Sequence, residues 1–310
     1  MRVYRGLESL PAGLPPSAVT IGKFDGVHRG HRSVIDAVVA AARRDGLTAT
    51  AVTFDRNPLR LLAPEKCPAD LTGPEQKVAL LGETGLDATL VLTFDHGLAA
   101  TSAEDFVADV LVGSLGMRRV LVGADFRFGA RNAGSVETLR SLAPRHGYEV
   151  EVIDDVCRSG GRRISSSWIR ELLAAGDVEA AAQLLGRLPA VTGEVVHGLE
   201  RGRTLGFPTA NLSADSEGMI PADGVYAGWL GLGGRRYPSA ISVGDNPTFG
   251  DVPAKQVEAH VVDADLDLYG KRVRVEFAHR IRGMVAFAGP EALALRIRDD
   301  VDETRALLAR

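Results

Sequence analysis

The sequence predicts an α/β protein with two domains: an N-terminal doubly wound parallel sheet, and a C-terminal antiparallel β-barrel with a closing helix. Its length of 310 residues exceeds the usual size of one domain. Short apolar strands alternate with helical segments in the first half, whereas strands follow one another directly in the second. The pattern changes near Gly186, so we expect domains at residues 1–186 and 187–310.

The first half consists of repeated strand–helix units. An apolar run at 18–22 predicts the first strand, and the helix predicted at 31–46 stops at Gly46. Parallel strands of this apolar kind are covered on both faces, and their ligands lie beyond the carboxyl ends of the strands. The further strands and helices are predicted, in order, at 48–54, 73–85, 88–94, 102–116 and 118–123.

Period-two patterning with Gly, Pro and Asp turns predicts an antiparallel sheet or barrel in the second half. Val273, Val275 and Phe277, for example, alternate with charged neighbours. A closing helix is expected to begin near Pro290. The predicted strands are 190–198, 224–232, 237–244, 256–264 and 271–279.

Composition and charge narrow the choice of partners. The net charge is −4 and the basic residues are scattered, whereas long nucleic acid would require a basic stripe. Cys67 and Cys157 are far apart, which is typical of a protein in a reducing compartment. Neither a signal peptide nor a bilayer-spanning apolar stretch is indicated. We therefore expect a cytoplasmic protein without nucleic-acid or membrane partners, and we leave self-association open.

The stretch TIGKFDGVHRGH places His28 and His31 in a glycine-rich turn between a strand and a helix. A zinc site is disfavoured, because a catalytic zinc takes three protein ligands and the other histidines and cysteines show no matching spacing. The histidines could instead cap or brace the loop. Phosphate binding is favoured, since such turns let backbone N–H groups approach an anion at a helix N-terminus.

Four stretches together resemble one family. The H-x-G-H at 28–31 resembles the signature with which α/β-phosphodiesterase-type nucleotidyltransferases bind ATP phosphates. The longer run 20–31 resembles the FMN adenylyltransferase module of bacterial bifunctional riboflavin kinase/FAD synthetases, and 52–62, 122–129 and 164–187 match that family in order. The resemblance implies attack by the FMN phosphate on the α-phosphorus of ATP, with release of pyrophosphate.

The resemblance also implies roles for single residues. His28 and His31 would donate hydrogen bonds to the oxygens of the reacting phosphorus. Ser165, Ser166 and Arg170 would hold the distal phosphates, although a plain serine N-cap is the alternative for the serines. Asp125 would contact flavin or nucleotide, or would be a turn residue. The remaining expected phosphate-binding residues are Gly22, Phe24, Asp25, Gly26 and Gly30, and Asn57 joins Asp125 as an expected flavin-binding residue.

Two departures from the family pattern fall at this site. Arg56-Asn57-Pro58 replaces the usual Pro-His-Pro, so that the middle side chain donates a hydrogen bond but carries no charge. Lys23 stands where the family often has Asn or a small residue, and its ammonium would assist or obstruct phosphate binding. The alternative hypothesis is a riboflavin kinase whose adenylyltransferase site has drifted and become weak or inactive.

The run GLERGRTLGFPTANL (198–212) carries a second motif. A long barrel loop with turn formers would explain its glycines. Thr209 and Asn211, however, point the same way in an extended segment, and a hydroxyl and an amide oxygen side by side suit Mg²⁺. The glycines before them would let the loop wrap a triphosphate.

This run resembles the riboflavin kinase signature, with support from 221–228, 241–249 and 257–277. The resemblance implies a six-stranded barrel that transfers the γ-phosphate of ATP to the ribityl 5′-hydroxyl of riboflavin. Glu258 matches the catalytic base of the family, whereas spacing alone does not distinguish it from Glu276. The expected ATP-binding residues are Gly198, Gly202, Arg203 and Gly206, the expected metal ligands are Thr209 and Asn211, and the expected flavin-binding residues in the flap-like loop 244–251 are Asn246 and Thr248.

We therefore expect a bifunctional enzyme that makes FMN in its C-terminal domain and FAD in its N-terminal domain. Both steps would need Mg²⁺ and ATP, and the expected partners are riboflavin, FMN, FAD, ATP, ADP and pyrophosphate. A non-catalytic flavin-binding paralogue is the alternative from another class. It is disfavoured because a mere binder needs neither Glu258 nor the pair Thr209 and Asn211.

Overall fold

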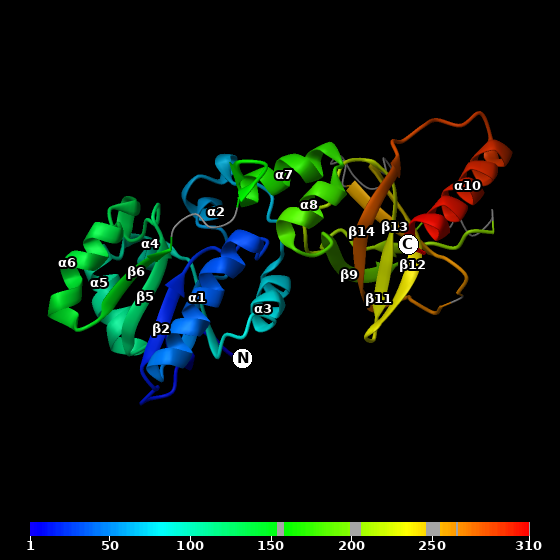
Figure 1. Ribbon diagram of the computed structural model, residues 1–310. Helices are drawn as coiled ribbons and strands as arrows, with labels where there is room; N and C mark the ends of the chain where they lie inside the picture. The colour runs from blue at the N-terminus through cyan, green and yellow to red at the C-terminus, as the bar shows by residue number, and fades with distance from the viewer. Residues whose placement is uncertain (154–157, 199–205, 246–254, 265, 310) are drawn as a thin grey trace. The chain divides into compact units, whose positions relative to one another are not determined.

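A computed structural model describes residues 1–153, 158–198, 206–245, 255–264 and 266–309 (Figure 1). The chain divides into two compact units. The first contains Met1–Asp70 and Pro74–Ser165, and the second contains Leu71–Gly73 and Ser166–Arg310. Across the described ranges, none of the helices combines the length and the apolar character that crossing a bilayer requires.

The first unit is built on a parallel sheet, as predicted. Its six strands lie in the order β1-β4-β3-β2-β5-β6, and each neighbouring pair runs parallel. The strands are β1 (Arg2–Arg5), β2 (Ser17–Ile21), β3 (Thr48–Phe54), β4 (Ala88–Leu92), β5 (Met117–Gly123) and β6 (Glu149–Ile153). The sequence did not indicate β1, a short and largely exposed edge strand, or β6 at the opposite edge.

Helices cover both faces of this sheet (Figure 1). The longer ones are α1 (Arg29–Asp45), α3 (Pro74–Gly82), the π-helical segment η3 (Phe106–Ser114) and α6 (Val136–His146). The shorter ones are η1 (Leu7–Ser9), α2 (Leu59–Leu62), η2 (Pro64–Lys66), α4 (His96–Ala100), α5 (Ala103–Asp105) and η4 (Ala130–Asn132). Helix α1 ends at Gly46 in a left-handed conformation, as its sequence predicts, because glycine adopts positive φ without a steric penalty.

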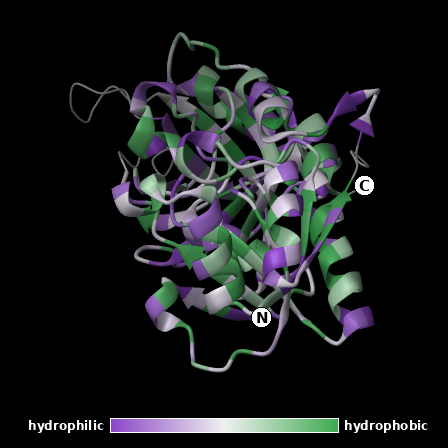
Figure 2. Ribbon diagram, turned by 90° about the vertical axis from the view of Figure 1, so that its left-hand side faces the viewer, coloured by the Kyte–Doolittle hydropathy of each residue, from purple (hydrophilic) through white to green (hydrophobic). Residues whose placement is uncertain are grey.

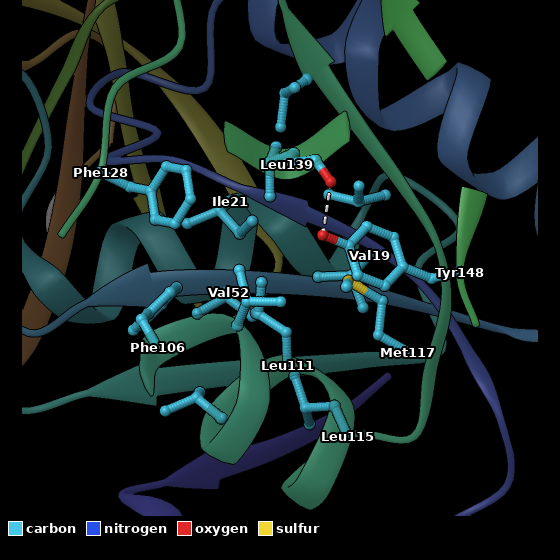
Figure 3. Close-up of a cluster of buried hydrophobic side chains, with 14 of the residues drawn as sticks. Val19, Ile21, Val52, Phe106, Leu111, Leu115, Met117, Phe128, Leu139 and Tyr148 are labelled. Carbon is cyan, nitrogen blue, oxygen red and sulfur yellow. Dashed lines mark hydrogen bonds between the residues drawn. The ribbon is translucent and has the colours of Figure 1, made fainter. Parts of the chain in front are cut away.

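Two hydrophobic cores follow from the alternation of side chains along the strands. Ala18 packs with Ile35 and Val38 of α1, whereas its neighbour Val19 packs on the opposite face with Leu111 of η3. Figure 3 shows this second core, in which the Tyr148 hydroxyl donates a hydrogen bond of 2.7 Å to the Leu139 carbonyl. Figure 2 shows hydrophobic and hydrophilic residues alternating along the helices, as helices with one buried face require. The carboxyl ends of the strands thus belong to a sheet that is packed on both faces.

The second unit contains a closed barrel whose strands lie in the order β10-β13-β12-β11-β14-β9, with all paired strands antiparallel. The predicted barrel is therefore confirmed. Its strands are β9 (Ala190–Val196), β10 (Ala210–Leu212), β11 (Gly224–Leu232), β12 (Arg235–Asp245), β13 (Lys255–Val261) and β14 (Arg272–Arg282).

Helices α7 (Ser166–Ala175) and α8 (Val178–Leu185) pack with the barrel. The Leu173 carbonyl accepts a hydrogen bond from the Ala222 N–H at 2.9 Å, and Glu179 lies 3.2 Å from the His279 ring nitrogen. The small hairpin of β7 (Arg158–Ser159) and β8 (Arg162–Arg163) belongs to the first unit. Packing does not decide which activity these helices serve, so the functional boundary at 186/187 stays a prediction.

The closing helix α10 (Pro290–Leu308) is anchored by a buried carboxylate. The Asp300 side chain is 4% exposed and forms ion pairs with Arg282 at 2.7 Å and with Arg296 at 3.2 Å. Val301 of the same helix packs against Ala240 of β12. Polar and apolar contacts together fix α10 on the barrel wall.

Candidate active sites

The glycine-rich loop between β2 and α1 contains three residues with left-handed backbone. The φ angles of Phe24, Gly26 and Val27 are 48°, 83° and 36°. Positive φ strains a β-branched residue, and here burial of Phe24 and Val27 in the core beneath α1 holds the strained path in place. A side chain at Gly22 would press on the Phe24 ring. The loop therefore enters α1 along one fixed route.

His28 is the N-cap of α1. Its Nδ1 accepts a hydrogen bond from the His31 N–H at 3.3 Å, and the ring is buried. Because Nδ1 is an acceptor, the neutral ring carries its proton on Nε2. His28 thus braces the loop, as the alternative interpretation expected. The cap hydrogen bond also orients its imidazole ring.

The His31 ring stacks on the His28 ring, with centroids 3.7 Å apart, and meets the Phe24 ring edge-on. A Cβ at Gly30 would lie 3.2 Å from His28 ring atoms and 3.5 Å from the Ile164 carbonyl oxygen. The absence of a side chain at position 30 therefore brings the segment that ends in Ser165 close to the histidine pair. Ser166 and Arg170 lie in α7 of the second unit, so their predicted role at these histidines stays a prediction.

The segment after β3 holds the departure at 56–58. The Asn57 Oδ1 atom accepts a hydrogen bond from the Leu59 N–H at 3.1 Å and so supports the start of α2. Arg56 pairs with Asp55, whose other oxygen accepts from the Phe94 N–H at 2.9 Å. Burial opposes ionisation of Asp55, but the Phe94 N–H and Arg56 outweigh it and lower the pKa of this carboxyl.

Asp125 follows β5 and is held by Arg163 of β8. The guanidinium donates to both carboxylate oxygens, at 2.7 and 3.1 Å, and these hydrogen bonds lower the pKa of Asp125 below its ordinary value. The sequence did not single out Arg163. The position of Arg163, a basic residue just before the serine-rich segment 165–167, could have indicated it.

In the second unit, Thr209 and Asn211 line a cavity of about 520 Å³ whose wall includes Pro208, Leu268 and Tyr269. The side chain of Asn211 is buried, and its Oδ1 accepts a hydrogen bond from Gln256 Nε2 at 3.2 Å. The lining of the cavity therefore includes the Thr209 hydroxyl, directly before β10, and the Asn211 amide within β10.

Glu258 of β13 lies opposite Asn211 of β10 in the strand register. Its Oε2 accepts a hydrogen bond from the Thr209 hydroxyl at 3.3 Å. Glu276 is placed differently: it forms ion pairs with Arg236 at 2.7 Å and Arg274 at 3.0 Å. The register thus separates two glutamates that spacing could not separate.

Gly198 lies against the carboxamide of Asn211. A Cβ at this position would fall within 2.7 Å of three atoms of that amide, so a side chain would displace the amide. Gly206 has a left-handed φ of 86°. The other expected residues of these loops, Gly202, Arg203, Asn246 and Thr248, lie outside the described residues.

Comparison with known proteins identifies both halves. The family model described as FAD synthetase matches residues 11–168, and the model described as riboflavin kinase matches residues 185–308. The Escherichia coli (strain K12) bifunctional riboflavin kinase/FMN adenylyltransferase is 38% identical over 302 residues, which cover 97% of this chain and 96% of the relative. The chain belongs to the bifunctional riboflavin kinase/FMN adenylyltransferase family.

Further relatives of this family cover the chain equally well. The Pseudomonas fluorescens protein of the same name is 36% identical over 309 residues, covering 100% of this chain and 98% of the relative. A solved structure titled as a macrolide-efflux protein from Streptococcus pneumoniae has a TM-score of 0.87 and 29% identity, and covers 98% of this chain and 99% of that one. The predicted family and the predicted pair of enzymatic activities are confirmed by the family models and the curated relatives, and neither alternative gains support.

Proposed function

We propose that the second unit phosphorylates riboflavin to FMN and that the first unit adenylylates FMN to FAD, with ATP as the co-substrate of both reactions. The observation that carries this proposal is that each unit contains a compact group of polar residues of the types that these reactions require. The first unit holds a capped and stacked histidine pair at the start of α1. The second unit holds Thr209, Asn211 and Glu258 in contact with one another or in register.

In the first unit, the FMN phosphate attacks the α-phosphorus of ATP and pyrophosphate leaves. His28 donates from Nε2 to an oxygen of that phosphorus, because its Nδ1 already accepts the cap hydrogen bond. His31, stacked on it, supplies a second donor, and the N-terminus of α1 adds positive potential. Donors fixed before reaction stabilise the developing charge without reorganisation. Catalysis here is positioning and electrostatics.

The distal phosphates of ATP are assigned to Ser165, Ser166 and Arg170 and to the glycine-rich loop. Proximity of Ile164 to Gly30 supports the assignment of Ser165, because it places that segment beside the loop. A guanidinium and hydroxyls suit the charge of a pyrophosphate. The loop residues assigned to phosphate are Gly22, Phe24, Asp25, Gly26 and Gly30.

Flavin binding in the first unit is assigned to Asn57 and Asp125. The Oδ1 of Asn57 is engaged by the Leu59 N–H, so its NH₂ group is the part that serves a ligand. Asp125 is oriented by the two hydrogen bonds from Arg163. Asn57 therefore offers donors and the pair Asp125–Arg163 offers both signs of charge.

In the second unit, Glu258 acts as the general base on the ribityl 5′-hydroxyl. The Thr209 hydroxyl and the pairing of β13 with β10 hold its carboxylate in place. General-base assistance requires a carboxylate within hydrogen-bond reach of the hydroxyl that it activates. The cavity beside Thr209 and Asn211 receives ATP. Gly198, Gly202, Arg203 and Gly206 are assigned to its phosphates, and Asn246 and Thr248 to the flavin.

The residues at this cavity fit Mg²⁺. Thr209 and Asn211 contribute oxygen atoms, and the Asn211 amide is oriented by Gln256 and by the close approach of Gly198. The Asn211 oxygen keeps a lone pair beyond the bond from Gln256. Thr209 and Asn211 would hold the ion, which would neutralise charge on the phosphates of ATP. We also propose a cytoplasmic location, where the substrates riboflavin and ATP would meet the protein.

A two-product assay tests the proposal. Purified protein with riboflavin, ATP and Mg²⁺ is expected to form FMN and then FAD, separated by chromatography. FMN supplied directly with ATP is expected to give FAD without riboflavin. FMN without FAD would establish the drifted adenylyltransferase site, and flavin binding without either product would establish the non-catalytic paralogue.

A further inference from the structure

Lys77 is a buried lysine that the proposed chemistry does not use. It lies on the face of α3 that packs into the core with Leu80 and Leu81, and it is 8% exposed. Transfer of an ammonium out of water costs free energy unless it is paired or hydrogen-bonded. Burial accordingly lowers the pKa of Lys77 below its ordinary value.

The groups that compensate Lys77 come from the loops at the carboxyl edge of the sheet. Its Nζ donates a hydrogen bond of 2.6 Å to the Phe54 carbonyl at the end of β3. The carboxylates of Asp25, Asp70 and Asp55 favour its charged form. These three acidic residues are the charged groups that act on the ammonium.

Two of these connections reach the predicted substrate loops. Asp25 belongs to the glycine-rich loop before α1, and Phe54 directly precedes the Asp55–Asn57 segment. The glycine-rich loop is joined to β3, the strand that leads into the Asp55–Asn57 segment, by two hydrogen bonds. The Thr53 hydroxyl donates to the Lys23 carbonyl at 3.3 Å, and the Gly22 N–H donates to the Val52 carbonyl at 3.0 Å. Lys77 adds a hydrogen bond from a buried ammonium at the carboxyl end of this same strand.

We propose that Lys77 is a positioning residue for FAD synthesis. Its ammonium donates to the Phe54 carbonyl where β3 passes into the flavin loop, and β3 is itself hydrogen-bonded to the phosphate loop through Val52 and Thr53. Lys77 thereby fixes the spacing between the two substrates. This inference rests on the proposed adenylyltransferase function of the first unit. Small misplacement of reacting groups lowers the rate of a positioning-driven reaction steeply.

Lys77→Met tests the role of the charge, because methionine keeps a long side chain without an ammonium. We expect kcat for FAD formation from FMN and ATP to fall by about 100-fold, with a much smaller change in KM. Riboflavin phosphorylation in the same preparation is expected to stay unchanged and reports on the second unit.

Leu80→Ala is the matched control on the same buried face of α3. It is expected to lower the thermal stability of the first unit at least as much as Lys77→Met does, while kcat for FAD formation is retained. An equal loss of kcat in Leu80→Ala would show that Lys77 is merely structural. Full kcat in Lys77→Met would overturn the proposal outright.

Lys77→Arg adds a readout that a structural role would not move. The wild-type kcat for FAD formation is expected to fall as pH rises through the lowered pKa of Lys77, while the three carboxylates stay ionised. Arginine stays charged, so this fall should move to higher pH. An identical alkaline fall in both proteins would contradict the proposal. If Lys77→Arg does not fold, the Met and Ala variants still decide.

The failure of this inference differs from the failure of the proposed function. A wild-type protein that makes no FAD would remove the adenylyltransferase function itself. A wild-type protein that makes FAD, beside a Lys77→Met variant that matches it, would remove only the role of Lys77.

Discussion

The two units build their candidate sites by different means. In the first unit, the candidate residues sit on loops beyond the sheet, and a helix cap at His28, buried loop residues and a hydrogen bond from Lys77 to the Phe54 carbonyl support these loops. In the second unit, the register of β10 and β13 places Asn211 opposite Glu258, and the Thr209 hydroxyl next to β10 donates to the Glu258 carboxylate. The first site therefore depends on tertiary contacts, and the second depends on the barrel ladder.

The largest expected effect tests whether the two sites are independent. Replacing both histidines, His28→Ala with His31→Ala, should lower kcat for FAD formation by about 1,000-fold or more, because each preorganised donor contributes about 100- to 1,000-fold. FMN formation from riboflavin should be retained. A two-product chromatographic assay measures both rates, and an equal fall in both would break the comparison.

His28→Asn separates the two tasks of the first histidine. Asparagine is a good N-cap, so His28→Asn should lose less thermal stability than His28→Ala, which loses the cap as well as the ring packing. FAD formation should still be lost, since the Nε2 donor is gone. If His28→Asn makes FAD at the wild-type rate, the imidazole serves the helix alone.

A somewhat smaller effect is expected at the second site. Glu258→Gln should lower kcat for riboflavin phosphorylation by about 100- to 10,000-fold, the usual share of general acid–base catalysis. Riboflavin binding, followed by fluorescence, and FAD formation from supplied FMN should persist. Glu276→Gln, which alters a carboxylate paired with Arg236 and Arg274, is the matched control and should keep its turnover.

At both sites, the sequence predicted the features that neighbouring residues determine better than the features that depend on contacts between distant parts of the chain. The alternation of Thr209 and Asn211 is local, so the sequence shows it directly. Spacing did not distinguish Glu258 from Glu276, and the choice rested on the family resemblance, because the surroundings of each glutamate depend on a register set by other strands. In the first unit, Gly46 marked the end of α1 correctly because its left-handed φ is a local property. The sequence offered the cap at His28 only as an alternative for both histidines, and the buried Lys77 was missed. Its spacing of three and four residues from Leu80 and Leu81 places Lys77 on the apolar face of the helix, and this spacing could have revealed its burial.

Errors in the predicted elements have similar causes. The segment predicted as one helix at 102–116 forms α5 and the π-helical η3, because hydrophobic periodicity does not distinguish these hydrogen-bond patterns. Strand β1 has little buried surface, so its alternation carried no signal. The repeated patterns along the chain predicted the fold class. They did not reveal the single strands at the edges of the sheet.

The buried carboxylate of Asp300 in the closing helix gives a prediction for the stability of the second unit. Asp300→Asn leaves Arg282 and Arg296 beside a neutral partner, and breaking a buried pair in this way costs about 3–5 kcal/mol. The loss should appear in urea unfolding of the second unit and in riboflavin phosphorylation at raised temperature. Asp302→Asn, in an exposed pair with Arg305 on the same helix, should change little. An Asp300→Asn variant whose urea unfolding matches that of the wild type would contradict this prediction.

The smallest expected effect concerns the core of the first unit. Burial raises the pKa of Tyr148 to about 12, so the folded state favours the neutral phenol. Its contribution to stability is full below the unfolded pKa of 10.0 and decreases as pH rises toward 12, by about 2 kcal/mol. Tyr148→Phe should remove this alkaline slope from the free energy of unfolding, at the expense of one hydrogen bond. An alkaline slope that persists unchanged in Tyr148→Phe would contradict this assignment.

The presence of a separate core in each unit has a genetic consequence. A damaging allele in one half need not abolish the other half, and two defective gene copies with lesions in different halves would complement each other. FMN released by one polypeptide would then be captured and adenylylated by another, through the bulk solution of the cell. Alleles of this gene should accordingly fall into two complementation groups that divide along the chain.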